Sequence, residues 1–250
     1  MSNQPNQTNQ PNQKYIDIIA ILDASGSMEY MGKEPIQAIN AFIETQKETA
    51  TGKETFSLIT FSTLFKTIID NENLLSMEPV NQNSYITEGF TALNDAICST
   101  IKTTLESDKP DDKILLVITD GQENASKKYK KSDVKKYISL VEEKNNWKVI
   151  FLGANMDALE EGTNLSISQT RCSQFDQQTP GNLLEICRSA SDSANKYRRA
   201  LTNGTNGTNG SIDLILSDNT VKTLSDSFYK PPSNPSKQNP FFKKFVRNLT

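Results

Sequence analysis

The stretch YIDIIAILDASGSM, residues 15–28, carries the strongest indication of the fold class of this chain. Residues 15–22 form a short apolar run rich in isoleucine, which is typical of a strand covered on both faces of a sheet. Strands of this kind belong mainly to parallel sheets in α/β proteins. Asp23 follows the run directly, so the predicted strand ends in a carboxylate.

Helix and strand patterns alternate after this first strand. Pro35 suits the first turn of a helix, and apolar residues recur at helical spacing from there until Gly52. The segments 55–62 and 64–70 are rich in β-forming residues and almost adjacent, which predicts a hairpin. One edge strand of the sheet is therefore expected to be antiparallel.

The second half of the chain repeats the alternation. Further strands are expected at 113–119, at 148–153 and, as a short one, near 165–168. Further helices are expected after Thr91, after Ser132 as N-cap, and from Pro180 to about 201. The fold class predicted is an α/β sandwich with a mostly parallel central sheet, one antiparallel edge strand and helices on both faces.

Polar segments flank the predicted domain. Residues 1–14 are an Asn/Gln/Pro repeat that we expect to be a disordered tail, and the folded domain is expected to span 15–201. The NGT repeat at 202–211 predicts a flexible linker. Residues 212–250 are expected to form a short hairpin or tail, largely disordered.

Composition excludes several function classes. The chain contains no histidine, so a Ser-His-Asp triad and a histidine-ligated zinc site are both excluded. Its three cysteines, Cys98, Cys172 and Cys187, form no CxxC pair, and we interpret them as buried or surface thiols. A net charge of −3 argues against a strongly basic nucleic-acid binder.

The sequence also bears on location. No apolar run reaches the roughly 18 residues that a membrane span requires. The N-terminus has neither the basic start nor the apolar core of a secretory signal. We therefore expect an intracellular, cytoplasmic protein.

Oxygen-bearing side chains gather at the expected strand ends. Asp23, Ser25 and Ser27 stand at alternate positions of one loop, Asp120 ends a later strand, and Thr91 precedes a helix. One carboxylate pair with three hydroxyls suits a hard cation such as Mg²⁺. Each residue also has a structural explanation, because Ser27 or Thr91 could cap a helix and either aspartate could brace a turn.

The motifs DASGSM, GFTALNDAI and VITDGQEN resemble the metal-ion-dependent adhesion site (MIDAS) of the von Willebrand factor A (vWA) family. The resemblance covers about 15–200 and implies a Rossmann-like sheet flanked by helices. It assigns metal-binding roles to Asp23, Ser25, Ser27, Thr91 and Asp120, with Mg²⁺ or Mn²⁺ as the ion. The segment FLGANMDA at 151–158 is also similar to an intracellular branch of the family in bacteria, phages and large DNA viruses.

The expected function is recognition. Two carboxylates at most neutralise a divalent ion, so the metal can still accept an anion, which an Asp or Glu of a protein partner would supply. The prediction is a metal-dependent protein–protein interaction module without enzymatic activity. The alternatives are a Mg²⁺-dependent hydrolase of phosphate esters and a structural domain whose metal serves only folding.

Two basic stretches leave their roles open. Residues 127–136 carry six lysines after the Asp120 loop and form either a solvated face or a patch that attracts an acidic partner or a polyanion. The stretch NPFFKKFVRN at 239–248 is basic and aromatic, and it could dock on a partner or membrane or pack on the domain.

Overall fold

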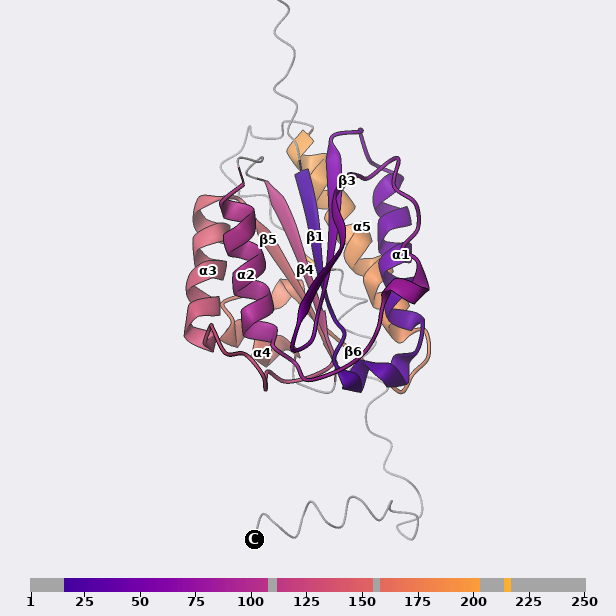
Figure 1. Ribbon diagram of the computed structural model, residues 1–250. Helices are drawn as coiled ribbons and strands as arrows, with labels where there is room; N and C mark the ends of the chain where they lie inside the picture. The colour runs from indigo at the N-terminus through magenta and orange to yellow at the C-terminus, as the bar shows by residue number, and fades with distance from the viewer. Residues whose placement is uncertain (1–15, 108–111, 155–157, 203–213, 217–250) are drawn as a thin grey trace, which may run out of the picture.

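The computed structural model describes residues 16–107, 112–154, 158–202 and 214–216 (Figure 1). Strands and helices alternate along this part of the chain. The strands are β1 (Ile16–Asp23), β2 (Glu54–Phe61), β3 (Phe65–Asn73), β4 (Lys113–Thr119), β5 (Lys148–Ala154) and β6 (Cys172–Phe175). The α-helices are α1 (Glu34–Lys47), α2 (Leu93–Leu105), α3 (Lys131–Lys144), α4 (Ala158–Asn164) and α5 (Asn182–Thr202).

The strands form one six-stranded sheet in the order β3-β2-β1-β4-β5-β6. All neighbours pair in parallel except β2 and β3, which form the antiparallel hairpin at the edge. The predicted fold class is thereby confirmed, including its single antiparallel edge strand. Strand order reverses between β1 and β4, where ligands usually bind in open α/β sheets.

The sheet separates two hydrophobic cores. Alternate side chains of a strand point to opposite faces, so Ile18, Ala20 and Leu22 of β1 pack with α1 and α5, whereas Ile19 and Ile21 pack with α2 and α3. Figure 1 shows α2 and α3 on one side of the sheet and α1 and α5 on the other. Burial on both faces explains why β1 and β4 read as continuous apolar runs.

The start of α3 differs from the position that the sequence predicted. Ser132 was expected to cap α3, but Lys130 occupies that position and Ser132 lies within the helix. The Asp133 carboxylate accepts a hydrogen bond of 3.0 Å from the Lys130 backbone N–H, which satisfies the helix start without a serine. Among the described helices, none is long and apolar enough to cross a membrane.

The last strand is also displaced from its expected position. Leu165 and Ile167 were expected in a strand near 165–168, but β6 starts at Cys172 and the earlier segment is a turn. The N–H groups of Leu165 and Ile167 donate to the Gly162 carbonyl, so these residues bury their side chains without joining the sheet. The predicted tail at 1–14 lies outside the described residues, as do the linker and C-terminal segment apart from 202 and 214–216.

Candidate metal site

The two predicted metal-binding aspartates meet at the switch point of the sheet. Asp23 is the last residue of β1, and Asp120 follows β4 directly. Because β1 and β4 are paired in parallel up to Leu22 and Ile118, both carboxylates emerge at the same edge. That edge is the lower end of the sheet in Figure 1.

The loop after β1 brings its hydroxyls to Asp120. The Asp23 carboxylate accepts a hydrogen bond of 2.7 Å from the Ser25 N–H, which turns the chain so that Ser25 and Ser27 project alike. Their Oγ atoms lie 3.1 Å apart, and Ser27 Oγ donates to Asp120 Oδ1 at 2.8 Å. Four of the five predicted ligands therefore form one connected cluster.

Thr91 joins this cluster from a third loop. A methyl group added at Gly121, next to Asp120, would lie 3.2 Å from Thr91 Oγ1 and 3.9 Å from Ser27 Oγ. Asn124 fixes Thr91 on both sides, because its Oδ1 accepts from the Thr91 N–H at 2.9 Å and its N–H donates to the Thr91 carbonyl at 3.0 Å. All five predicted site residues are thus brought together.

Helix capping does not account for the two hydroxyl residues Ser27 and Thr91. Ser27 lies inside a short 3-10 helix, η1 (Gly26–Met31), and the residue before α2 in the N-cap position is Ala92. Neither Ser27 nor Thr91 therefore caps a helix. Asp23 does brace its turn through Ser25, but its other oxygen faces β4.

Three further residues contact the two aspartates, although little or nothing in the sequence predicts their role. Thr119 Oγ1 donates to Asp23 Oδ2 at 2.6 Å, and the side-chain amide of Gln177 donates to Asp120 Oδ2. The Tyr85 hydroxyl donates to the Asp23 carbonyl at 2.6 Å. Thr119 could have been suspected because it precedes Asp120, whereas Gln177 and Tyr85 arrive from loops whose positions only the fold defines.

Burial disfavours the charged form of the two carboxyl groups when no cation is nearby. Burial, assisted by Asp120, raises the pKa of the Asp23 carboxyl to about 6, although hydrogen bonds from Thr119 and Ser25 act in the opposite direction. Burial also raises the pKa of Asp120, against hydrogen bonds from Ser27 and Gln177. Asp23 is fully buried and Asp120 is 4% exposed, so a bound cation would relieve a real electrostatic cost.

The oxygen set fits a small hard cation. Octahedral Mg²⁺ with ligands at about 2.0–2.1 Å places neighbouring ligand oxygens about 2.9 Å apart. The Ser25–Ser27 and Ser27–Asp120 oxygen pairs lie 3.1 and 2.8 Å apart. In the described part of the chain, no group of three or more His, Cys, Asp or Glu side chains could hold a metal, so the hydroxyls are essential to any such site.

Comparison with known proteins identifies the family. A model of the von Willebrand factor type A domain matches residues 17–188, which is more than half of the chain. The chain belongs to the von Willebrand factor A family. No curated protein matches it.

Solved structures share the vWA fold at low identity. Proximal thread matrix protein 1 (PTMP1) from the mussel byssus has a TM-score of 0.55 and 17% identity, covering 73% of this chain and 47% of that one. A von Willebrand factor type A structure from Catenulispora acidiphila has a TM-score of 0.51 and 16% identity, covering 73% and 43%. PTMP1 with a zinc-occupied MIDAS motif has a TM-score of 0.50 and 18% identity, covering 73% and 46%. This vWA chain spans less than half the length of these structures, and the likeness concerns the fold alone.

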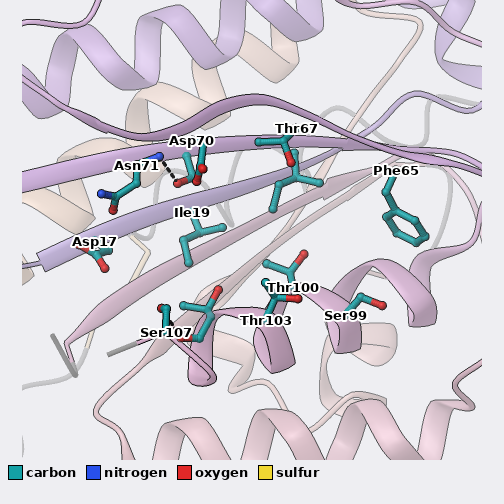
Figure 2. Close-up of a pocket in the computed structure, with 13 residues that line it drawn as sticks. Asp17, Ile19, Phe65, Thr67, Asp70, Asn71, Ser99, Thr100, Thr103 and Ser107 are labelled. Atoms are coloured by element: carbon teal, nitrogen blue, oxygen red, sulfur yellow. Dashed lines mark hydrogen bonds between the residues drawn. The ribbon is translucent and has the colours of Figure 1, made fainter. Parts of the chain in front are cut away.

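A separate groove of about 410 Å³ lies on the flank of the vWA domain, between α2 and the β2–β3 hairpin (Figure 2). Hydroxyl side chains of α2, including Ser99, Thr100 and Thr103, face the strands across it. Its buried carboxylate, Asp17, is already paired with Lys113 at 2.8 Å. The groove contains none of the predicted metal ligands and is not the candidate site.

Proposed function

We propose that this vWA domain is a metal-dependent protein-interaction module, in which a MIDAS-bound Mg²⁺ or Mn²⁺ accepts an Asp or Glu carboxylate of a partner protein. The observation that carries the proposal is the convergence of Asp23, Ser25, Ser27, Thr91 and Asp120 at one sheet edge. The zinc-occupied MIDAS of PTMP1 supports metal binding at this position of the fold.

The chemistry of the ligands supports the exchange of a carboxylate. Only Asp23 and Asp120 carry charge, so the ion at most becomes neutral and still attracts an incoming anion. Ser27 is exposed while Asp23 and Ser25 are buried. An incoming group would therefore approach from the side of Ser27, and the buried residues would anchor the ion from below.

We propose that the site is not catalytic. The chain has no histidine to act as a general base, and both carboxylates are held by hydrogen bonds from Ser25, Ser27, Thr119 and Gln177. Purified protein should therefore hydrolyse no phosphate ester in the presence of Mg²⁺. Hydrolysis that is lost in Asp23→Ala would establish the hydrolase alternative instead.

The proposed location is the interior of the cell. The three cysteines are free and buried thiols in the described structure. Thiols of this kind fit a reducing compartment. Fractionation of cells that express the full chain would test the location.

Metal binding is the first test. Mg²⁺ at about 100 times its dissociation constant should stabilise the fold by about 2.7 kcal/mol, which corresponds to a rise in Tm of about 5–10 °C for a domain of this size. Ser25→Ala and Asp120→Asn should abolish the rise, because the first removes a ligand and the second removes half of the site's formal charge. Thr91→Ala should keep the fold and impair mainly the partner-bound state. An equal rise in Tm for wild type and Asp120→Asn would contradict the proposal.

A further inference from the structure

Large apolar side chains are unusually exposed around the candidate metal site. Soluble proteins seldom gather such side chains in one place unless the surface binds something. Five of the eight large apolar residues that are exposed in the described structure lie in the loops, the short helix η1 and the start of β3 at the site edge of the sheet. The five are Tyr30, Leu64, Phe65, Ile86 and Phe90, and the other three are Leu75, Leu105 and Ile215.

Three of these side chains, Leu64, Ile86 and Phe90, form what we call the apolar rim. They are 73%, 65% and 68% exposed. Leu64 lies in the turn between β2 and β3, and the other two lie in the loop that leads to Thr91. The β2–β3 turn lies at the carboxyl edge of the sheet, as the metal loop does, and the loop after β3 starts at the opposite edge and reaches the carboxyl edge before Thr91 (Figure 1).

Hydrogen bonds fix the rim to the metal loop. The N–H of Glu88 donates to the Ala24 carbonyl at 2.8 Å, and the N–H of Gly26 donates to the Gly89 carbonyl at 3.1 Å. The Phe90 N–H donates to Thr63 Oγ1 at 3.0 Å, which joins the loop to the β2–β3 turn. The rim is therefore held in a constant position relative to the metal ligands, as a prearranged binding surface requires.

A hollow of about 190 Å³ lies beside the rim. Leu64, Phe65 and Ile86 supply its apolar wall, and Lys66 and Glu88 also line it. Ala24, the residue after Asp23, forms part of the same lining, so the hollow borders the metal loop directly.

We propose that this hollow and the apolar rim receive a large apolar side chain of the partner protein, which lies within about three residues of the carboxylate that binds the metal. An extended chain advances about 3.3 Å per residue, so such a spacing lets one peptide segment reach both the ion and the adjoining hollow. The inference rests on the proposed function and specifies its partner: an acidic residue flanked by an apolar one. The observation that supports the inference is that Ala24 of the metal loop also lines the hollow.

Displayed heptapeptide libraries test this pairing. One library carries a fixed central Asp and the other a fixed central Asn, with the remaining positions random. Both are selected on the full chain with Mg²⁺ and with a chelator. The expected result is retention of the Asp library only, only with Mg²⁺, and with enrichment of Leu, Ile, Phe or Met beside the Asp.

Variants of the rim, compared with a control variant, then test whether the rim binds the enriched apolar residue. Ile86→Ser, and separately Leu64→Ser, should weaken binding of the best synthetic peptide at least tenfold. Leu75→Ser is the control, because Leu75 is also half exposed but follows β3 at the opposite edge of the sheet. It should change the affinity less than twofold. Replacing the apolar residue of the peptide with Ser should weaken binding to wild type but not further to Ile86→Ser.

The outcomes separate this inference from the proposed function. Mg²⁺-dependent binding of Asp peptides without apolar enrichment, or with equal affinity for Ile86→Ser, would overturn the inference and leave the metal-dependent module standing. Absence of Mg²⁺-dependent retention would overturn both. A wild-type dimer that Leu64→Ser converts to a monomer in size-exclusion chromatography would mean that a second copy covers the rim, and would also overturn the inference.

Discussion

At the scale of single residues, Thr119 is the side chain outside the five predicted ligands that bears most directly on the proposed metal site. Thr119 is fully buried and donates to Asp23 at 2.6 Å from the neighbouring strand. This bond favours the charged form of Asp23 and so opposes the effect of burial on its pKa. Groups that orient metal ligands in this way commonly change metal affinity by 10–100-fold.

Thr119→Val tests this contribution. Valine keeps the shape and removes the hydroxyl, so the Asp23 carboxyl should become harder to ionise and Mg²⁺ should bind about tenfold more weakly. Thr119→Ser should restore most of the affinity, since the hydroxyl returns. Calorimetric titration with Mg²⁺ measures the three proteins. If Thr119→Val and wild type bound Mg²⁺ with equal affinity, the hydrogen bond from Thr119 to Asp23 would be dispensable for metal binding.

At the scale of secondary-structure elements, α4 shows how closely a helix can approach the sheet. A Cβ added at Gly162 would overlap with the Cys172 sulfur at the start of β6, and would also lie 3.8 Å from a Phe151 ring carbon. Glycine therefore permits the contact between α4 and β6.

Gly162→Ala should therefore destabilise the domain, although alanine is the better helix former by about 1 kcal/mol. Overpacking against Cys172 should cost about 1–3 kcal/mol in the free energy of unfolding. The double variant Gly162→Ala with Cys172→Ala should recover part of the loss, because the sulfur is gone. Urea denaturation monitored by circular dichroism gives the values. A stabilised single variant would show that the helix moves away without cost.

At the scale of the whole molecule, a buried ion pair joins the first half of the sheet to the last helix. Glu54, at the start of β2, lies 2.8 Å from Arg198 of α5, and their side chains are 4% and 2% exposed. Arg198 also donates to Gln46 of α1 at 2.6 Å. Burial would raise the pKa of Glu54, but the hydrogen bonds from Arg198 and Thr51 outweigh it and leave the pKa below its ordinary value of 4.5.

The direction of this shift predicts a pH dependence. A lowered carboxyl pKa contributes stability that is complete above about pH 4.5 and is lost as the pH falls through the lowered value. Glu54→Gln should cost about 3 kcal/mol at pH 7, since it leaves a buried cation without its anion. The difference from wild type should shrink below about pH 4. Urea unfolding from pH 7 to pH 3 measures it, and a difference independent of pH would contradict the assignment.

Much of this architecture can be predicted from the sequence, because its signals are local. The continuous apolar runs of β1 and β4 indicate strands buried on both faces, and the adjacent segments of β2 and β3 indicate a hairpin. Pro35 locates the start of α1 to within a residue, whereas the helix ends at Lys47, before the predicted stop at Gly52. The DxSxS, Thr91 and Asp120 motifs also name the five residues that the fold brings together.

Periodicity along the chain is enough to predict which side chains are buried and which oxygen-bearing residues stand at strand ends. The tertiary structure alone decided which remote groups complete the site. Gln177 reaches Asp120 from the loop after β6, and Tyr85 and Ile86 reach the metal loop from a segment without periodicity. The start of β6 was also mispredicted, since Leu165 and Ile167 are apolar but are buried in the turn after α4, and pairing with β5 begins at Cys172. Contacts of this kind depend on how far apart the elements lie in space. The spacing of residues along the chain does not contain these distances.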